Sequence, residues 1–478
     1  MRQDTEEALS RIDTKGWKRI PLEYGHETLE IVVPADSIEI SMGTVPYIDD
    51  WREEIERAFS NPIGSPKLDE IIRNKEKRPE DMTASVTVSD ITRPVPYKGE
   101  KGILNPLLRV LEAQGIKRNN IKIIVGTGMH RASTHEEKVQ MYGQEIVDRY
   151  PIIDHDCENE GLLVSIGKTK RGTHVYVNRD FYFADLKIAT GLVESHFMTG
   201  VSGGRKAVCP GLVDVKTIER FHGPYYLEDP NATNLILGGN PCHEEALEVA
   251  ETVGVDFLVN VTLDKDMRLT RVFTGDLIEA HMNAYDMIKA YAEVTLDRQF
   301  DIVLTHGGYV GRDHYQTAKA GVGAVPAVKQ GGVIIIVANN HDFRPIGGPE
   351  YRTLTHLLKM QGPDGYLELL RSPQWRFTKD QWEPEVWAIP LRRVGEEGLI
   401  YCSGEISQED CTILPGISGY EFLPPEFNNR SNREKAQVMV QNALICSVDR
   451  LRQGGLEPSV SYVREGPYAI PVFRDPLP

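Results

Sequence analysis

Short runs of branched apolar residues recur along the chain, each followed by a loop of small or polar residues and then by helical spacing. Each run is long enough for one buried strand, and strands that alternate with helices are typical of α/β folds with mainly parallel sheets. We therefore predict parallel sheets flanked by helices. Residues 29–34 predict an earlier strand, and residues 51–73 predict a helix that Asn61-Pro62 and Gly64 interrupt. The five runs occupy residues 85–89, 121–125, 186–190, 301–305 and 332–337.

A break in this pattern predicts the domain organisation. Helical spacing covers residues 277–296, the polar segment Asp297-Arg298-Gln299 follows, and the strand–loop–helix pattern then restarts. Polar segments of this kind often mark a domain boundary. We predict an N-terminal domain over residues 1–296, joined by the C-terminal segment 430–478, and a C-terminal α/β domain over residues 297–429.

The charge balance is acidic, with 54 Lys and Arg against 70 Asp and Glu, which gives a formal net charge of −16. Nucleic-acid-binding surfaces need clustered positive charge, so we expect no nucleic-acid partner. The sequence has no run of 18 apolar residues and no apolar segment near its first residue, so we expect no membrane helix and no secretory signal. Six cysteines without CxxC spacing favour a reducing, cytoplasmic setting over a disulfide framework or a zinc ribbon.

Candidate site residues follow several of the predicted strands. Asp90 and Arg93 lie in SDITRPVP, His130 lies in GTGMHRAST, and His196 lies in ESHFMTG. In open parallel sheets, ligands bind beyond the carboxyl ends of the strands, where we expect these side chains. A loop histidine suits proton transfer because its ordinary pKa is about 6.5. An arginine binds carboxylates, although an internal pair between Asp90 and Arg93 is an equally open interpretation.

The segment from residue 191 to residue 223 is the densest in candidate chemistry. It contains the loop Ser202-Gly203-Gly204, then Lys206 and His222. Successive glycines let backbone N–H groups approach an anion, and Lys206 adds a positive charge. The loop is not a Walker A motif, because Ala207 stands where that motif has Ser or Thr. A simple turn with a solvated lysine is the alternative interpretation.

A second group of candidates follows the run at residues 301–305. Tyr315, Gln316 and Lys319 lie in DHYQTAKA. Gln316 and Lys319 share one helix face because they are three residues apart. This face either presents an amide and an ammonium group to an anionic substrate or is an ordinary solvated face. Trp382 either packs over a substrate or belongs to the core, and the sequence leaves both interpretations open.

Taken together, these segments resemble the nickel-dependent lactate racemase family. The resemblance rests on DITRP, GTGxHR, ESHFMTGVSGGRKAVCPG with His222, and YQTAK, and it covers roughly residues 80–390. The spacings agree as well, with 66 residues from His130 to His196, 10 from His196 to Lys206 and 16 from Lys206 to His222. One departure is Ser195, which stands where the family motif has proline.

The resemblance implies a cofactor and its ligands. Family members carry a nickel-pincer nucleotide, a pyridinium-3,5-bisthiocarboxylic acid mononucleotide that chelates nickel. Lys206 matches the lysine that tethers this cofactor covalently, and His222 matches the histidine that completes the nickel coordination. The other residues that match the cofactor-binding set are Asp90, Ser202, Gly203 and Gly204.

The same resemblance implies a reaction and its residues. The implied enzyme is an isomerase that racemises or epimerises a 2-hydroxy acid by proton-coupled hydride transfer through a 2-keto acid. Family members act on lactate, malate, aryl lactates and sugar acids, and the sequence does not select among them. The matching residues are His130 and His196 as alternating acid and base, Arg93, Gln316 and Lys319 as substrate anchors, and Tyr315 and Trp382 as pocket lining.

The resemblance also implies partners and a location for the site. The partners are a small 2-hydroxy acid and separate proteins that synthesise the cofactor. Anchors lie on both sides of residue 297, with Arg93 before it and Lys319 after it. We therefore expect the active site in a cleft between the two domains.

Three other interpretations use the same residues. In the first, His130, His196 and His222 bind zinc in a hydrolase. In the second, Lys206 forms a Schiff base with a carbonyl substrate, with a pKa lowered by the adjacent Arg205. In the third, the protein binds a nucleotide or a keto acid without turnover. Metal content and the mass of any lysine adduct distinguish these interpretations from the nickel-pincer enzyme.

Overall fold

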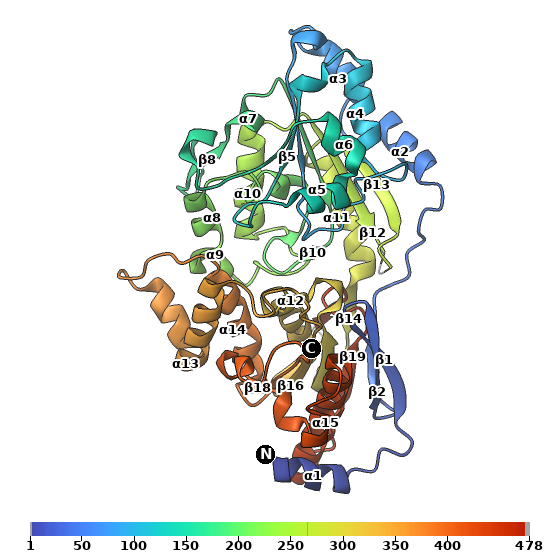
Figure 1. Cartoon of the computed structure of the whole chain (residues 1–478), viewed down its shortest axis with the longest axis vertical. Helices are drawn as coiled ribbons and strands as arrows, with labels where there is room; N and C mark the ends of the chain where they lie inside the picture. Colours follow the sequence, from blue (N-terminus) through green and yellow to red (C-terminus); the bar gives the residue numbers. More distant parts are fainter. Residues whose placement is uncertain (1, 265, 474–478) are drawn as a thin grey trace. The chain divides into compact units, whose positions relative to one another are not determined.

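The computed structural model describes residues 2–264 and 266–473. The chain divides into two compact units, and the first, which we call the central unit, is Thr44–Tyr291. The second, which we call the terminal unit, combines Met1–Gly43 with Ala292–Pro478. The central unit is thus an insertion between two segments that fold together (Figure 1).

A six-stranded sheet forms the middle of the central unit. Its strands are β4 (Ala84–Val88), β5 (Ile121–Val125), β6 (Ile152–Asp154), β9 (Leu186–Leu192), β12 (Phe257–Leu263) and β13 (Leu269–Gly275). They lie in the order β13-β12-β9-β4-β5-β6, and all are parallel except β13, which pairs antiparallel with β12. β5 and β9 flank β4, so the direction of the strand order reverses there. Ligands of open α/β sheets bind at such a switch point.

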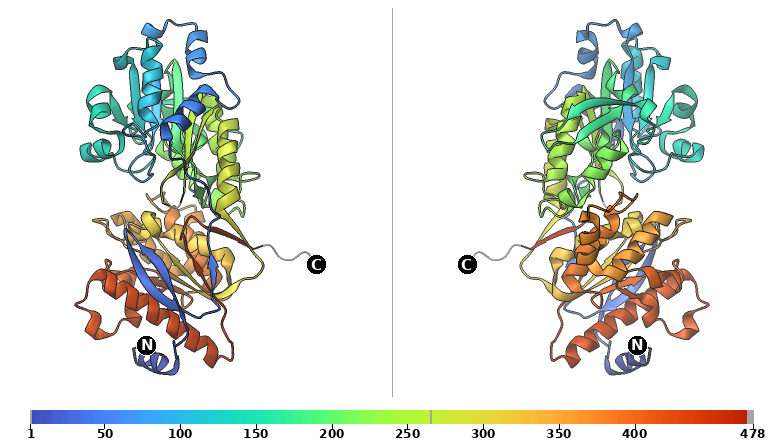
Figure 2. Two further views of the ribbon diagram at one scale, coloured as in Figure 1. Left: turned by 90° about the vertical axis from the view of Figure 1, so that its right-hand side faces the viewer. Right: turned by 90° about the vertical axis from the view of Figure 1, so that its left-hand side faces the viewer.

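The strands of this sheet are buried on both faces, which is expected of parallel strands covered by helices. Every residue of β4 and of β12 is buried. The helices are α2 (Trp51–Ser60), α3 (Leu68–Asn74), α4 (Leu104–Ala113), α5 (His135–Tyr142), α6 (Gln144–Arg149), α7 (Arg179–Tyr182), α8 (Val215–Phe221), α9 (Pro224–Leu227), α10 (Pro241–Val253) and α11 (Glu279–Ala292). α4 and α10 lie on opposite sides of the sheet (Figures 1 and 2). α4 packs through the helical spacing of Leu104, Leu107, Leu108 and Leu111.

Two hairpins complete the central unit. The first joins β7 (Leu163–Lys168) to β8 (His174–Asn178). The second joins β10 (Ser195–His196) to β11 (Gly200–Val201) directly after β9. This second hairpin is short, yet it carries one of the predicted catalytic histidines, His196.

The terminal unit contains a second six-stranded sheet. Its strands are β3 (Ile38–Ile40), β15 (Phe300–His306), β16 (Val328–Val337), β17 (Leu399–Cys402), β18 (Ile417–Ser418) and β19 (Val460–Val463). They lie in the order β18-β17-β16-β15-β19-β3, and every pair is parallel. The helices are α1 (Arg2–Arg11), α12 (His314–Ala324), α13 (Pro349–Arg371), α14 (Trp382–Val394) and α15 (Asn432–Gln453). An antiparallel pair, β1 (Lys18–Tyr24) and β2 (Glu27–Val33), and a parallel pair, β14 (Glu293–Leu296) and β20 (Ile470–Phe473), complete this unit.

The two ends of the chain fold differently from the predicted domain ranges. Residues 1–43 and 430–478 were assigned to the N-terminal domain, whereas they fold with residues 292–429. β3 pairs with β19, and the side-chain amide of Gln441 in α15 forms two hydrogen bonds with the backbone of Val32 in β2, at 2.8 and 3.0 Å. These long-range pairings decide the unit, and local sequence patterns do not encode them. The predicted boundary near residue 297 lies close to the division after Tyr291.

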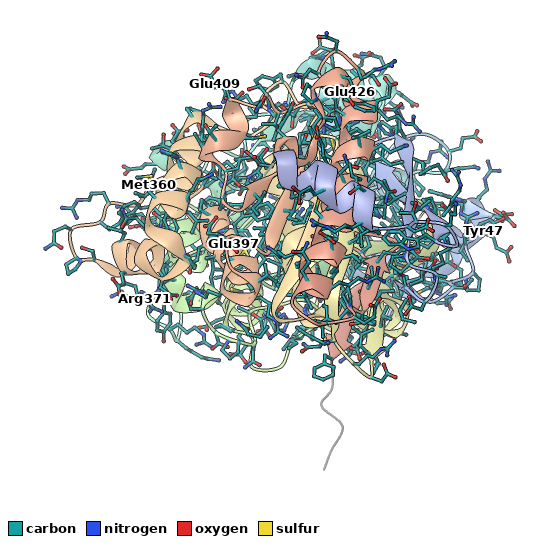
Figure 3. All side chains as sticks on the ribbon, turned by 90° about the horizontal axis from the view of Figure 1, so that it is seen from below. Tyr47, Met360, Arg371, Glu397, Glu409 and Glu426 are labelled. Carbon is teal, nitrogen blue, oxygen red and sulfur yellow. The ribbon has the colours of Figure 1, made fainter. Side chains whose placement is uncertain are left out.

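The fold class predicted from the sequence is confirmed, because both main sheets are dominated by parallel strands and flanked by helices. Large exposed apolar side chains are scattered on the surface. Met360 of α13, for example, is 67% exposed and projects from the terminal unit (Figure 3). Throughout residues 2–264 and 266–473, no helix has both the length and the apolar content needed to cross a membrane.

Candidate active site

Three loops at the carboxyl edge of the central sheet carry predicted site residues. Asp90 and Arg93 follow β4, His130 follows β5, and His196 follows β9. Because β5 and β9 both pair with β4, these loops leave the sheet side by side at the switch point. The structure thus assembles, within one unit, residues that are up to about a hundred positions apart in the chain.

His130 is hydrogen-bonded to a buried carboxylate. Its Nδ1 lies 2.6 Å from Oδ2 of Asp90, and the other carboxylate oxygen of Asp90 accepts hydrogen bonds from the backbone N–H and the hydroxyl of Thr92, at 3.0 and 2.5 Å. Burial alone would raise the pKa of Asp90, but the charge and hydrogen bond of His130 and the bonds from Thr92 outweigh it and lower the pKa to about 2. The ionised carboxylate accepts the Nδ1–H proton, so Nε2 of His130 is the nitrogen that takes up a proton.

His196 has a different environment on the β10–β11 hairpin. It is buried, and its ring stacks on Phe197 with the centroids 4.9 Å apart. Its Nδ1 accepts hydrogen bonds from the backbone N–H groups of Met198 and Thr199, at 3.2 and 3.3 Å. From this pattern we assign the proton of the neutral ring to Nε2, which lies 3.0 Å from Nζ of Lys206.

The loop between His196 and Lys206 is held by internal hydrogen bonds. The Ser202 hydroxyl donates to the carbonyl of Leu192 at 2.8 Å, and the N–H of Gly204 donates to Oδ1 of Asn260 at 2.9 Å. A Cβ on Gly204 would lie 2.6 Å from the ring of His281, so this position requires glycine. The sequence left two interpretations of this loop open, N–H groups that hold an anion and a simple turn. The N–H of Gly204 instead bonds within the protein, so here the loop fixes the approach to Lys206.

The buried side chain of Arg205 also holds this loop in place. Arg205 was not among the predicted site residues. Its side chain is 1% exposed, donates to the carbonyl of Thr199 at 2.6 Å, and lies 2.9 Å from Nε2 of His281. No carboxylate in the described parts of the chain lies within ion-pair distance of it. Burial therefore lowers the pKa of Arg205, to about 9. His281 and Asn260 have no motif signal, because they reach the loop from elements far away in the sequence.

Arg93 pairs with a residue that the sequence did not single out. Its Nη1 lies 3.1 Å from Oε1 of Glu194, the residue two positions before His196. The two side chains are 19% and 16% exposed. The internal pair with Asp90 that the sequence left open does not form, because the carboxylate of Asp90 is bonded to His130 and Thr92.

His222 lies at the end of α8, where its Nδ1 is 3.1 Å from the carbonyl of Ile218. A carbonyl only accepts, so Nδ1 carries the proton and Nε2 has the lone pair that a metal needs. Burial, together with the nearby charge of Lys206, lowers the pKa of His222 to about 3. His222 is thus a neutral imidazole, which is the form that binds metals.

The remaining predicted residues belong to the terminal unit. Tyr315, Gln316 and Lys319 lie in the first turns of α12, and Trp382 is the first residue of α14. The indole N–H of Trp382 donates to the Tyr315 hydroxyl at 2.8 Å, so these two predicted pocket residues are in contact. Gln316 and Lys319 are both partly buried on one helix, as their spacing predicted.

Acidic residues around Lys319 were missed by sequence reasoning. Asp313 caps α12 by accepting a hydrogen bond from the Gln316 N–H at 2.7 Å, and burial raises its pKa to about 7. Glu383 is buried beside Trp382, and burial raises its pKa well above its usual range although the charge of Lys319 opposes this shift. Both upward shifts reduce the negative charge around Lys319, because a protonated carboxyl is uncharged.

Comparison with known proteins identifies the family. Residues 24–234 match the model of the lactate racemase N-terminal domain. The chain is 34% identical to the lactate racemase of Lactiplantibacillus plantarum over 339 residues. This aligned region covers 70% of this chain and 77% of that protein. The chain belongs to the lactate racemase family. A second lactate racemase, from Thermoanaerobacterium thermosaccharolyticum, is 30% identical over 375 residues, or 77% of this chain and 85% of the relative.

Solved structures agree with membership of the lactate racemase family. The lactate racemase apoprotein from T. thermosaccharolyticum superposes with a TM-score of 0.77 at 25% identity and covers 96% of this chain and all of that one. A solved protein from Thermotoga maritima has a TM-score of 0.60 at 17% identity, with 87% of this chain and all of that chain covered. The second likeness shows the fold alone.

The three histidines of this family member do not form a ready-made metal site. In the part of the chain that the structure describes, no group of three or more His, Cys, Asp or Glu side chains is arranged to hold a metal ion. His130 is bonded to Asp90, and His196 faces Lys206. A zinc hydrolase usually supplies three protein ligands from one cluster.

Proposed function

We propose that this chain racemises or epimerises a 2-hydroxy acid, with lactate as one candidate, through a planar 2-keto acid. The observation that carries the proposal is the pair of histidines on loops that leave the sheet side by side at the switch point. Arg93, beside them, is suited to hold a carboxylate. Relatives named lactate racemases support the same reaction class.

The residues present fit a nickel-pincer nucleotide. His222 offers one imidazole nitrogen with a lone pair, and Lys206 supplies the primary amine that a covalent tether needs. A cofactor that brings its own carbon and sulfur ligands needs only one ligand from the protein, in agreement with the missing three-residue cluster. We assign the covalent tether to Lys206 and the nickel ligand to His222. When bound, the cofactor supplies hydride acceptance from Cα and hydride return.

The proton steps fall to the two histidines. Removing the Cα hydrogen of a 2-hydroxy acid as a proton is difficult, because the adjacent carboxylate destabilises the carbanion. Nε2 of His130 instead accepts the hydroxyl proton as the hydride leaves, and the Asp90 carboxylate stabilises the imidazolium that forms. The imidazolium form of His196 gives a proton to the oxygen after the keto acid has exposed its other face, which inverts the centre, and its neutral form is the base in the reverse direction.

The substrate carboxylate is assigned to Arg93, Gln316 and Lys319. An arginine and a lysine neutralise the carboxylate, and the amide of Gln316 adds a hydrogen bond. These anchors must hold the acid while its carbonyl changes face.

The proposal is tested by producing the chain together with proteins that synthesise the cofactor. We expect a nucleotide-sized increase in intact mass, about one nickel per chain by elemental analysis, and loss of optical rotation with at least one acid from a panel of 2-hydroxy acids. Lys206→Ala should lack the adduct. An unmodified, nickel-free chain, from cells in which a control racemase is loaded, would contradict the cofactor. A loaded chain that racemises no acid in the panel would contradict the reaction.

A further inference from the structure

The ion pair between Arg93 and Glu194 spans the switch point of the central sheet. Arg93 lies in the loop after β4, and Glu194 lies between β9 and β10. The backbone of Glu194 is fixed, since its N–H donates to the Ser202 hydroxyl at 3.0 Å and its carbonyl accepts from the Ser202 N–H at 2.9 Å. Glu194 is thus a rigid point against which the longer arginine side chain can be oriented.

The guanidinium group of Arg93 is only partly used. Nη1 pairs with Glu194, while Nε and Nη2 form no hydrogen bond with any residue in the ranges that the structure describes. Arg57 of the same unit contrasts with it, because its Nε and Nη2 both bond Glu54 at 2.7 Å and Nη2 also bonds the carbonyl of Val272. Arg57 is a structural arginine whose Nε and Nη2 donors bond within the protein. Arg93 has one side held and the other side available to a carboxylate.

We infer that Glu194 is a positioning residue, which holds Arg93 so that the remaining N–H groups of the guanidinium face the substrate carboxylate. The inference rests on the proposed function and adds a residue to it. Arginine has a long side chain with many rotamers, and binding a carboxylate bidentately requires one of them. Glu194 restricts these rotamers before the substrate arrives, which is preorganisation.

Glu194 could also weaken substrate binding, through charge repulsion. Its negative charge lies close to the place where the substrate carboxylate must bind, and like charges repel. If repulsion governed, removal of the charge would improve substrate binding. If positioning governs, removal weakens binding. The sign of the change in KM therefore decides between the two effects.

The test uses cofactor-loaded Glu194→Ala and Glu194→Gln. We expect KM for the 2-hydroxy acid to rise about tenfold in Glu194→Ala and about threefold in Glu194→Gln, whose amide oxygen still accepts from Arg93, with kcat changed by less than about threefold. The dissociation constant of the 2-keto acid, measured by calorimetry, should rise in parallel. In an Arg93→Met background, Glu194→Ala should cause no further loss of affinity, because Glu194 acts through Arg93. If Glu194 had a merely structural role, its loss would weaken binding in this background as well.

The matched control is Asp180→Asn, which breaks the pair between Lys122 and Asp180 at 2.8 Å elsewhere in the same unit and should leave KM unchanged. Thermal melting shows whether each variant folds. If Glu194→Ala does not fold, the KM of Glu194→Gln tests the role of Glu194. An unchanged or lower KM in Glu194→Gln, with an active wild type, would overturn the role of Glu194 alone. A loaded wild type that racemises nothing would overturn the proposed function and this role with it.

Discussion

His130 and His196 lie at the ends of two strands that flank the same central strand, yet their surroundings differ in almost every respect. The His130 side chain is 47% exposed and is supported by the Asp90 carboxylate. His196 is buried on a hairpin and is supported by two backbone N–H groups. A carboxylate fixes the proton on Nδ1, whereas N–H donors fix it on Nε2. The two environments thus set complementary proton states in chemically identical side chains.

The largest expected effect is the loss of either histidine. His130→Ala and His196→Ala should each reduce kcat for racemisation by roughly 10² to 10⁴, because each removes the proton transfer on one face. Polarimetry or chiral chromatography measures the rate, and intact mass checks that the Lys206 adduct remains. Full activity in either loaded variant would contradict the two-histidine assignment.

Asp90→Asn sharpens the comparison because it acts on one histidine alone. The amide no longer fixes the tautomer of His130 and cannot stabilise its imidazolium, so we expect kcat to fall by roughly 10² with the adduct mass unchanged. Thr134→Ala is the control, since it removes a helix cap on a neighbouring loop without touching His130. If the two variants lost equal activity, Asp90 would have no special role.

Gly204→Ala tests the support of His196 in the same way. A Cβ at Gly204 would lie 2.6 Å from the ring of His281, so the loop or the histidine must move. We expect a loss of about 1 to 3 kcal/mol in the free energy of unfolding, measured by chemical denaturation of the apoprotein. Gly238→Ala is the matched control, because nothing lies within 4 Å of its added Cβ. Equal stability in the two variants would contradict the tight packing of this loop.

The smallest expected effect is on acid stability. The pKa of Asp90 is lowered from 3.8 to about 2 in the folded protein, so its ionised form stabilises the fold above pH 4 and this contribution is lost as the pH falls through 2. The shift corresponds to about 2 kcal/mol. The stability difference between wild type and Asp90→Asn should therefore shrink between pH 6 and pH 3. A difference independent of pH would contradict the low pKa.

The sequence predicted the local elements well. The runs at residues 121–125 and 186–190 became β5 and β9, and the run at residues 301–305 lies within β15. The interrupted helix at residues 51–73 became α2 and α3. Such features depend on residues that are close together in the sequence, so local patterns predict them.

What the sequence could not predict depends on contacts between distant residues. Glu194 and Arg93 are about a hundred positions apart, and nothing local indicates their pairing. The same holds for Asn260 and His281, which fix the loop before Lys206. The glycines of that loop were considered as a way for an anion to approach the backbone. The structure shows that Gly204 also lets the ring of His281 pack closely against the loop. Motifs thus indicated the candidate residues, while the contacts that support them needed the fold.

The central claim is that the two histidines move the hydroxyl proton while the Cα hydrogen travels separately as a hydride. The most direct test is racemisation, in ordinary water, of a 2-hydroxy acid that carries deuterium at Cα, with the product analysed by mass spectrometry. The account predicts that the inverted product retains its deuterium, because a hydride does not exchange with solvent. Replacement of the deuterium by solvent hydrogen at the rate of racemisation would mean that a histidine removes the Cα hydrogen as a proton, and would contradict the account.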